Sequence, residues 1–186
     1  MLHLLILTAC NNINGMIKAY IPYSEIPEDY SLENAKKDNL VVFEDGDITS
    51  GQTVWDEFIE ITEQGKSYAV RLAFYYTFTP AYDQYEEIKD DYPLLVIQDL
   101  TFDGKIYTLY YVVGEKEYRF NYKYLKIFVE APPRKIVPYR ETIRYVLVND
   151  KKVTWEQIIS GMLSSRFGAW IDHKTIYTKY ITFPSK

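Results

Sequence analysis

The stretch that most constrains the fold runs from about residue 94 to residue 129, where apolar segments are separated by short turns. An Asp103-Gly104 pair lies between the first two apolar segments and is a strong β-hairpin signal, because both residues of a tight two-residue turn need positive φ. A second turn at residues 114–116 leads into residues 117–129, where aromatic and polar residues alternate. A period of two predicts strands with one buried and one solvated face. The sequence therefore predicts a central antiparallel meander over about 94–129.

Two other segments, about 54–64 and about 155–164, have apolar residues at helical spacing. Each carries a Trp and two further apolar residues at positions i, i+3 and i+4, which form one stripe along a helix. Gly65 has the position of a C′ glycine after the first helix, whereas Thr154 and Gln157 form a capping box at the start of the second. Both segments are therefore predicted to be amphipathic helices.

Shorter apolar runs predict additional strands around residues 40–43, 67–78, 143–148 and 175–183. A chain of 186 residues is long enough to bury most of its apolar surface in one domain. We therefore predict a single α+β domain over residues 31–186, with a mostly antiparallel sheet and both amphipathic helices packed on one face.

The N-terminus has the character of an export signal. Residues 1–9 are almost wholly apolar and are too short to span a bilayer, but they match the apolar core of a signal peptide. Leu7-Thr8-Ala9-Cys10 resembles the lipobox of bacterial lipoproteins, which implies cleavage before Cys10 and a lipid on its sulfur. Because no basic segment precedes the apolar run, we expect residues 1–9 to be a signal-peptide remnant whose true start lies upstream. The alternative is a buried N-terminal strand.

Cys10 is the only cysteine, so no disulfide can form within the chain. Lipid attachment would explain why an exported protein has a single cysteine. Two acyl chains hold a protein stably at a membrane surface. We therefore expect a lipid anchor at the extracytoplasmic face of a bacterial cell membrane. Residues 10–30 would form a tether, with Tyr20, Tyr23 and Tyr30 available to dock it onto the domain.

Several short segments of the chain carry a resemblance to a family. They are residues 35–42, 58–59, 65–66, 70–72 and 99–105. Together with the lipobox-like residues, these segments resemble small lipoproteins of Gram-positive bacteria that are classed only as uncharacterised, over roughly half of the chain. The resemblance implies a location at the cell envelope and an α+β fold. It implies no activity, and no functional residue can be carried over.

Few residues are suited to catalysis. His3 and His173 are the only histidines, which excludes a zinc site built from several Cys or His in the mature chain. No nucleophile elbow, phosphate-binding Gly loop or dinucleotide fingerprint occurs. The nearest nucleophile and base are Ser164-Ser165 and Asp172-His173, but adjacent Asp and His residues point apart on a strand. We predict no catalytic residue and no cofactor.

Carboxylates are more numerous and form two clusters in the sequence. They are Glu44, Asp45 and Asp47 around a Gly turn, and Glu86, Glu87, Asp90 and Asp91 farther on. The spacing of an EF-hand calcium loop is absent, and Asp-Gly-Asp is typical of a turn, so we predict no metal site. Acid pairs for glycoside hydrolysis need proximity in space and not in sequence. A carboxylate-dependent envelope hydrolase therefore stays open as an alternative.

The amino-acid composition limits the classes of partner that this chain can bind. The net charge of −5 argues against nucleic acid as a partner. The 19 tyrosines indicate either a Tyr-rich sheet or an exposed aromatic platform for a ligand. The polar connection at residues 79–93 is long enough to be a functional loop. It carries Tyr82, Tyr85 and Tyr92, which we expect to contact a ligand.

The leading hypothesis is a lipid-anchored, non-catalytic binding module for a peptide, glycan or protein partner. The alternatives are the hydrolase and a purely structural lipoprotein.

Overall fold

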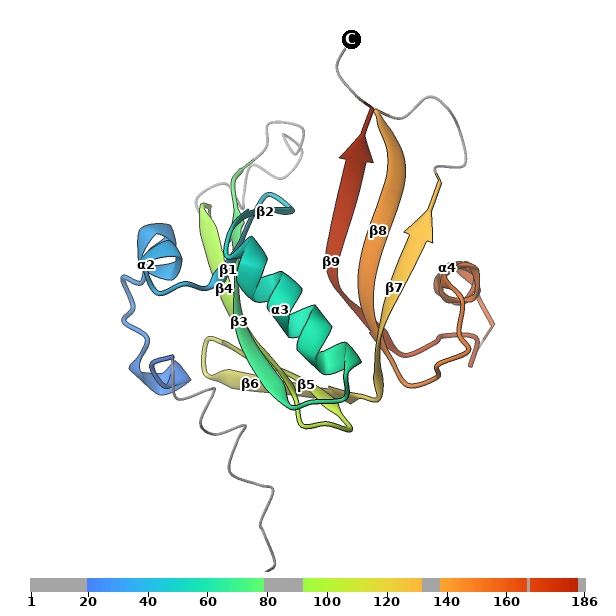
Figure 1. The fold of residues 1–186 in the computed structure, drawn as a ribbon, viewed down its shortest axis with the longest axis horizontal. Helices are drawn as coiled ribbons and strands as arrows, with labels where there is room; N and C mark the ends of the chain where they lie inside the picture. Colours follow the sequence, from blue (N-terminus) through green and yellow to red (C-terminus); the bar gives the residue numbers. More distant parts are fainter. Residues whose placement is uncertain (1–19, 79–91, 132–137, 167, 184–186) are drawn as a thin grey trace, which may run out of the picture. The chain divides into compact units, whose positions relative to one another are not determined.

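The computed structural model describes residues 20–78, 92–131, 138–166 and 168–183 (Figure 1). Within these ranges the structure is mostly β-sheet, with two sheets and three α-helices. This confirms the predicted α+β class. The contacts divide the chain into two compact units, residues 1–119 and 120–186. Among the described residues, no helix has the length and apolar character needed to cross a bilayer. One domain over residues 31–186 stays a prediction.

The first unit is built around a six-stranded sheet with the order β2-β1-β3-β4-β5-β6. Its strands are β1 (Val41–Glu44), β2 (Asp47–Ser50), β3 (Tyr68–Tyr76), β4 (Leu94–Phe102), β5 (Tyr107–Val113) and β6 (Lys116–Tyr122). β1 runs parallel to β3, whereas β1–β2, β3–β4 and β4–β5 are antiparallel. The boundary between the two units falls inside β6.

Local sequence signals mark the start of one helix of the first unit and the end of another. Ser31 caps α2 (Leu32–Lys37): its hydroxyl accepts from the Asn34 amide, and the Asn34 side chain accepts from the Ser31 amide. α3 (Gln52–Glu63) ends at Gly65, whose φ of +72° and whose hydrogen bond to the Thr62 carbonyl confirm the predicted C′ glycine. The helix starts slightly earlier than expected, after Gly51.

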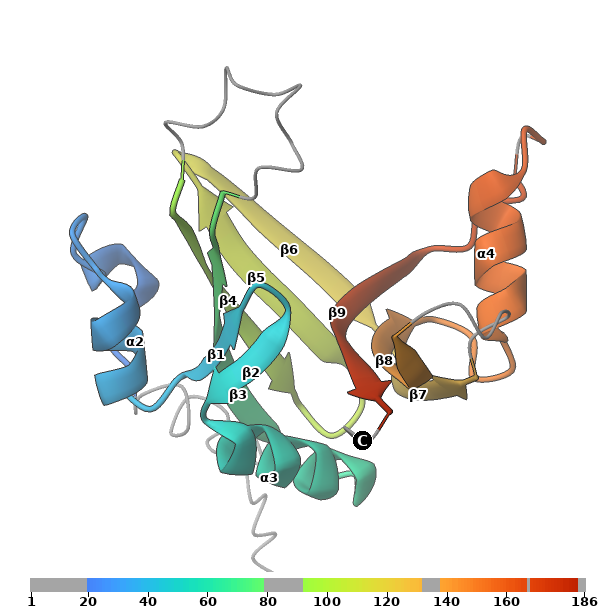
Figure 2. The same ribbon diagram turned by 90° about the horizontal axis from the view of Figure 1, so that it is seen from above.

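Both faces of the six-stranded sheet are covered, by α3 on one side and by α2 on the other (Figure 2). Trp55 and Phe58 of α3 are fully buried, and the Trp55 ring meets Phe43 of β1 edge to face at 6.3 Å. Five consecutive residues of β3, 69–73, are buried as a result. A central strand that is covered on both sides buries both sets of side chains.

The Asp103-Gly104 prediction of a two-residue turn is wrong in its geometry. β4 ends at Phe102 and β5 begins at Tyr107, so the connection is four residues long. The Asp103 carboxylate accepts hydrogen bonds from the amides of Lys105 and Ile106 at 2.8 and 2.7 Å, and only Gly104 has a positive φ. An Asp side chain that replaces a backbone acceptor favours this longer turn.

A two-residue turn occurs instead between β1 and β2, where Asp45 and Gly46 both have positive φ. The sequence predicted a turn at this point but did not predict β2 after it.

The second unit contains a three-stranded antiparallel sheet with the order β7-β8-β9 and one helix. Its elements are β7 (Tyr124–Glu130), β8 (Tyr139–Val148), α4 (Trp155–Leu163) and β9 (His173–Thr182). The predicted capping box of Thr154 and Gln157 is present. α4 packs through Ile158 against Val146 and Val148 of β8.

The predicted third strand of the meander is interrupted. β6 ends at Tyr122 and β7 begins at Tyr124, and the two strands belong to different sheets. At the break, the Lys123 amide donates to the Asn149 side chain at 3.3 Å instead of continuing a ladder. The chain therefore forms two sheets where one was predicted, and the two amphipathic helices pack on different sheets instead of sharing one face.

Candidate functional site

Most of the residues that the sequence singled out lie outside the described ranges: Cys10, Tyr82 and Tyr85. Tyr92 is described, just before β4, and its half-buried ring contacts Phe78 at 5.8 Å. The structure therefore places only one member of the predicted tyrosine set, in an intramolecular aromatic contact.

A buried ion pair lies at the centre of the sheet face that α2 covers. Arg71 of β3 and Asp99 of β4 are directly opposite in the antiparallel register. The Arg71 Nε donates to Asp99 Oδ1 at 2.6 Å and Nη2 donates to Oδ2 at 2.9 Å. The two side chains are only 3% and 12% exposed. This bidentate geometry satisfies both charges away from water.

The same guanidinium holds residues 20–30, which we call the N-terminal segment. Arg71 Nη1 donates to the Ile21 carbonyl at 2.6 Å, and the guanidinium lies over the rings of Tyr20 and Tyr23, 5.2 and 5.7 Å from their centroids. Tyr20, Tyr23 and Tyr30 all pack against the core of this face. The tyrosines thus dock the segment, as the sequence indicated they could.

Tyr23 connects the N-terminal segment to two further strands. Its hydroxyl donates to the Ile97 carbonyl of β4 at 2.5 Å, and its ring meets Tyr110 of β5 edge to face at 5.5 Å. Burial is the main cause that raises the pKa of Tyr20 and of Tyr23. The two phenols therefore stay neutral well into the alkaline range, and as neutral groups they suit a buried contact.

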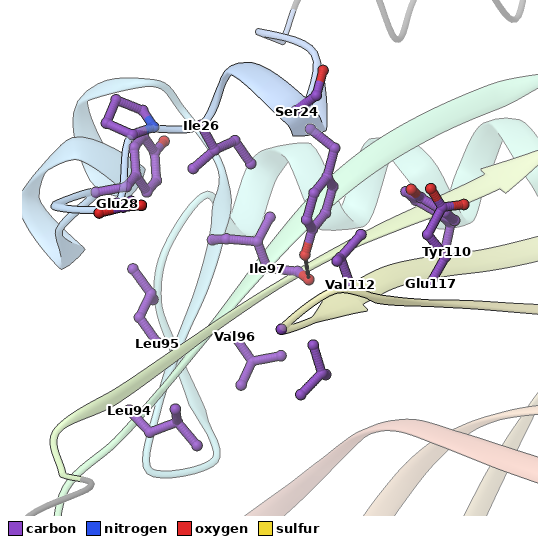
Figure 3. Close-up of a pocket in the computed structure, with 15 residues that line it drawn as sticks. Ser24, Ile26, Glu28, Leu94, Leu95, Val96, Ile97, Tyr110, Val112 and Glu117 are labelled. Atoms are coloured by element: carbon purple, nitrogen blue, oxygen red, sulfur yellow. Dashed lines mark hydrogen bonds between the residues drawn. The ribbon is translucent and has the colours of Figure 1, made fainter.

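A groove of about 540 Å³ lies between the N-terminal segment and strands β4, β5 and β6 (Figure 3). Its aliphatic side chains come from Ile26, Leu94, Leu95, Val96, Ile97, Val112 and Val113. Leu94 and Val113 are 43% and 56% exposed, so part of this apolar surface faces solvent. We call this space the groove. Its size and lining are those of a small-ligand or peptide site.

Two charged residues line the groove within the described part of the chain, and both are acids: Glu28 from the N-terminal segment and Glu117 from β6. In Figure 3 they lie toward opposite ends, with Ile97 between them. Burial, followed by the charge of Glu117, raises the pKa of the Tyr110 hydroxyl. Arg119 covers the Tyr110 ring, with its guanidinium carbon 4.9 Å from the ring centroid. The groove therefore combines an aliphatic surface with two carboxylates.

Comparisons with protein-family models, with curated proteins and with solved structures found no match to this chain.

The acids around the Gly46 turn have structural partners. The Asp45 carboxylate accepts from the Thr77 amide and hydroxyl at 2.8 and 2.6 Å, and these hydrogen bonds lower its pKa. The Glu44 carboxylate accepts from Thr49 and pairs with Lys36, which lowers the pKa of Glu44. Within the described ranges, no group of three potential metal-ligating residues gathers.

The Ser, Asp and His residues of the second unit do not form a triad. The Asp172 carboxylate lies 3.2 Å from the Tyr122 hydroxyl and 3.3 Å from the Asn149 amide nitrogen. His173 Nδ1 lies 2.7 Å from the Ile171 carbonyl. Neither contact joins Asp172 to His173, so neither residue orients the other for base catalysis.

The groove is not evident from the sequence pattern. One signal was present: Arg71 stands in the middle of an otherwise apolar strand, and a buried Arg needs an acid opposite it. Asp99 occupies the matching position in β4. Recognising the pair requires the β3–β4 register, because 28 positions separate the two residues in the sequence.

Proposed function

We propose that this chain is a non-catalytic binding module whose groove takes an extended peptide segment of a partner protein. The observation that supports this most is the aliphatic groove between the N-terminal segment and strands β4–β6. An apolar groove with a few polar groups is the usual form of a peptide site, in which pockets select side chains.

The nature of the lining favours a peptide over a glycan. Sugars are commonly bound on open aromatic faces, whereas the exposed large hydrophobic residues of this lining, Leu94 and Val113, are aliphatic. Three tyrosines line the groove among the described residues. Tyr23 and Tyr110 are in contact with each other, Arg119 covers the Tyr110 ring, and the Tyr30 hydroxyl donates to Asp38. Aliphatic side chains of a peptide therefore fit this surface better.

A carboxylate-dependent hydrolase is the second candidate, because two acids line one groove. Glycoside hydrolysis needs its two carboxyl groups to flank a single bond, about 5 to 9.5 Å apart. Glu28 and Glu117 lie toward opposite ends of the groove in Figure 3, with an aliphatic side chain between them. This separation favours a binding role for both.

We also propose that the protein is located at the cell envelope. A lipid on Cys10 would anchor it at the extracytoplasmic face of a bacterial cell membrane, as in the small lipoproteins that its lipobox-like residues resemble. Tyr20, the first docked residue, follows Cys10 by ten positions. Ten residues reach at most about 35 Å. One wall of the groove is the N-terminal segment itself, so the anchor would keep the groove close to the membrane.

The anchor has a direct test. Expressed from its own gene, the wild type should lose residues 1–9, gain the mass of a diacylglyceryl group and sediment with membranes. Cys10→Ala should do none of these, because it lacks the sulfur that carries the lipid. Intact mass and membrane fractionation measure all three. An unmodified Cys10 in a cytosolic protein would contradict the proposed location at the membrane.

The binding role is tested with a matched pair of surface variants. Val113 lines the groove and Val129 lies on β7, and their exposed fractions are nearly equal, 56% and 59%. For a peptide selected from a random heptapeptide library on the wild type, Val113→Ser should weaken binding by about tenfold, since burying a valine contributes about 1.5 kcal/mol.

Val129→Ser should leave the affinity unchanged, and fluorescence anisotropy measures both. If selection gives no peptide, or if the two variants behave alike, the groove is not the binding site.

A further inference from the structure

We propose that the groove selects a basic peptide, one in which Lys or Arg flanks aliphatic residues. This inference rests on the proposed binding function and specifies its ligand. Among the described residues that line the groove, Glu28 and Glu117 are the charged ones, and no lysine, arginine or histidine joins them. A cationic segment is the complement of an apolar surface with this charge.

The two carboxylates are available to a ligand. No ion pair joins either Glu28 or Glu117 to another residue within the described ranges. By contrast, the acids Asp99 and Glu130 are paired with Arg71 and Arg144 at 2.6 Å. The Tyr110 hydroxyl hydrogen-bonds to Glu117, but it carries no charge. A basic side chain that enters the groove can therefore form an ion pair with either carboxylate without displacing another charged group.

The placement of the acids suits an extended segment. Glu28 and Glu117 lie at opposite ends of the groove with Ile97 between them (Figure 3). A single compact cation cannot contact both carboxylates. A short peptide can place an aliphatic side chain in the middle of the groove and a basic side chain at each end. Side chains at alternate positions of an extended peptide point the same way, which allows this arrangement.

The aliphatic part of the ligand contributes affinity and the basic part contributes selectivity. Ion pairs at a partly exposed rim are weak, typically below about 1 kcal/mol each, so one carboxylate alone should change the affinity by about two- to fivefold. Burial of aliphatic side chains does not depend on salt in this way. The preference for basic residues should therefore fall as ionic strength rises, while the underlying binding persists.

Three labelled pentapeptides test this with the full chain: Lys-Leu-Val-Leu-Lys, Gln-Leu-Val-Leu-Gln and Glu-Leu-Val-Leu-Glu. By fluorescence anisotropy at low salt, the basic peptide should bind best and the acidic one worst. Glu28→Gln and Glu117→Gln should each weaken the basic peptide by about two- to fivefold, and the double variant by about tenfold. Neither change should affect the neutral peptide.

Glu60→Gln is the matched control, because Glu60 is an exposed acid on α3, which covers the opposite face of the sheet. This variant removes the same charge and should leave the preference intact. Raising the salt from 50 to 500 mM should remove most of the preference for the basic peptide.

The outcomes separate the two proposals. If the three peptides bind equally, or if the acidic one binds best, the basic-peptide inference is overturned while the binding role survives. If none of them binds, and no library peptide is sensitive to Val113→Ser, the binding role itself fails. If Val113→Ser instead dissociates a dimer in analytical ultracentrifugation, the occupant is a second copy of the chain and the inference is overturned.

Discussion

Replacing Asp99 with alanine should lower the free energy of unfolding by about 3–5 kcal/mol, because the change leaves the buried Arg71 charge without its partner. Arg71 is only 2% exposed as a residue and donates two of its hydrogen bonds to this carboxylate. Water cannot replace the lost acceptor at this depth. Urea denaturation followed by circular dichroism measures the loss.

A double variant separates the charge from the packing. Arg71→Met combined with Asp99→Leu replaces the ion pair with apolar side chains, and such replacements are often neutral or stabilising. The double variant should therefore be more stable than Asp99→Ala. A loss equal to or greater than that of Asp99→Ala would show that the charge pair itself, and not the unpaired charge, decides the stability.

The same double variant should lose the docked N-terminal segment, because Arg71 also donates to the Ile21 carbonyl. Its sheet would be stable, but proteases should cut within residues 20–30. The variant should also bind peptides more weakly, since this segment forms one wall of the groove. Resistance to proteolysis together with normal peptide binding would mean that the tyrosine contacts suffice to hold the segment.

Features decided by neighbouring residues could be predicted from the sequence. The Gly65 ending and the Thr154 capping box each depend on residues within four positions of one another, and both are present in the structure. The class of the fold followed from the same local periodicities. The predicted apolar face of α4 was only partly right, because Leu163 is 83% exposed whereas Ile158 is fully buried.

Features decided by distant residues could not be predicted. Alternation continues from Tyr122 to Tyr124 without a Gly or Pro, so nothing local marks the break at Lys123, which depends on Asn149. The groove likewise brings the N-terminal segment next to β4, β5 and β6. Its formation depends on the docking of Tyr23 and Ile21, and hence on strand pairing that the sequence pattern does not specify.

Gly51→Ala is the second substitution with a large expected effect, and Gly65→Ala is its matched control. The two glycines flank α3 and have nearly the same backbone conformation, with φ of +74° and +72°. A Cβ on Gly51 would lie 2.5 Å from the Leu40 carbonyl oxygen and 2.9 Å from the Val41 Cα, whereas a Cβ on Gly65 would meet nothing within 4 Å.

Both variants bear the cost of a left-handed conformation, about 1–2 kcal/mol, but only Gly51→Ala also forces β1 away from the start of α3. Overpacking of this kind typically costs a further 1–3 kcal/mol or so. Gly51→Ala should therefore lose about 3 kcal/mol in urea denaturation and Gly65→Ala about half of that. Equal losses would mean that β1 moves aside easily.

α3 covers the face of the sheet opposite the groove. Folded Gly51→Ala protein should therefore still bind the basic peptide with wild-type affinity. This result would separate the stability of the sheet from recognition in the groove.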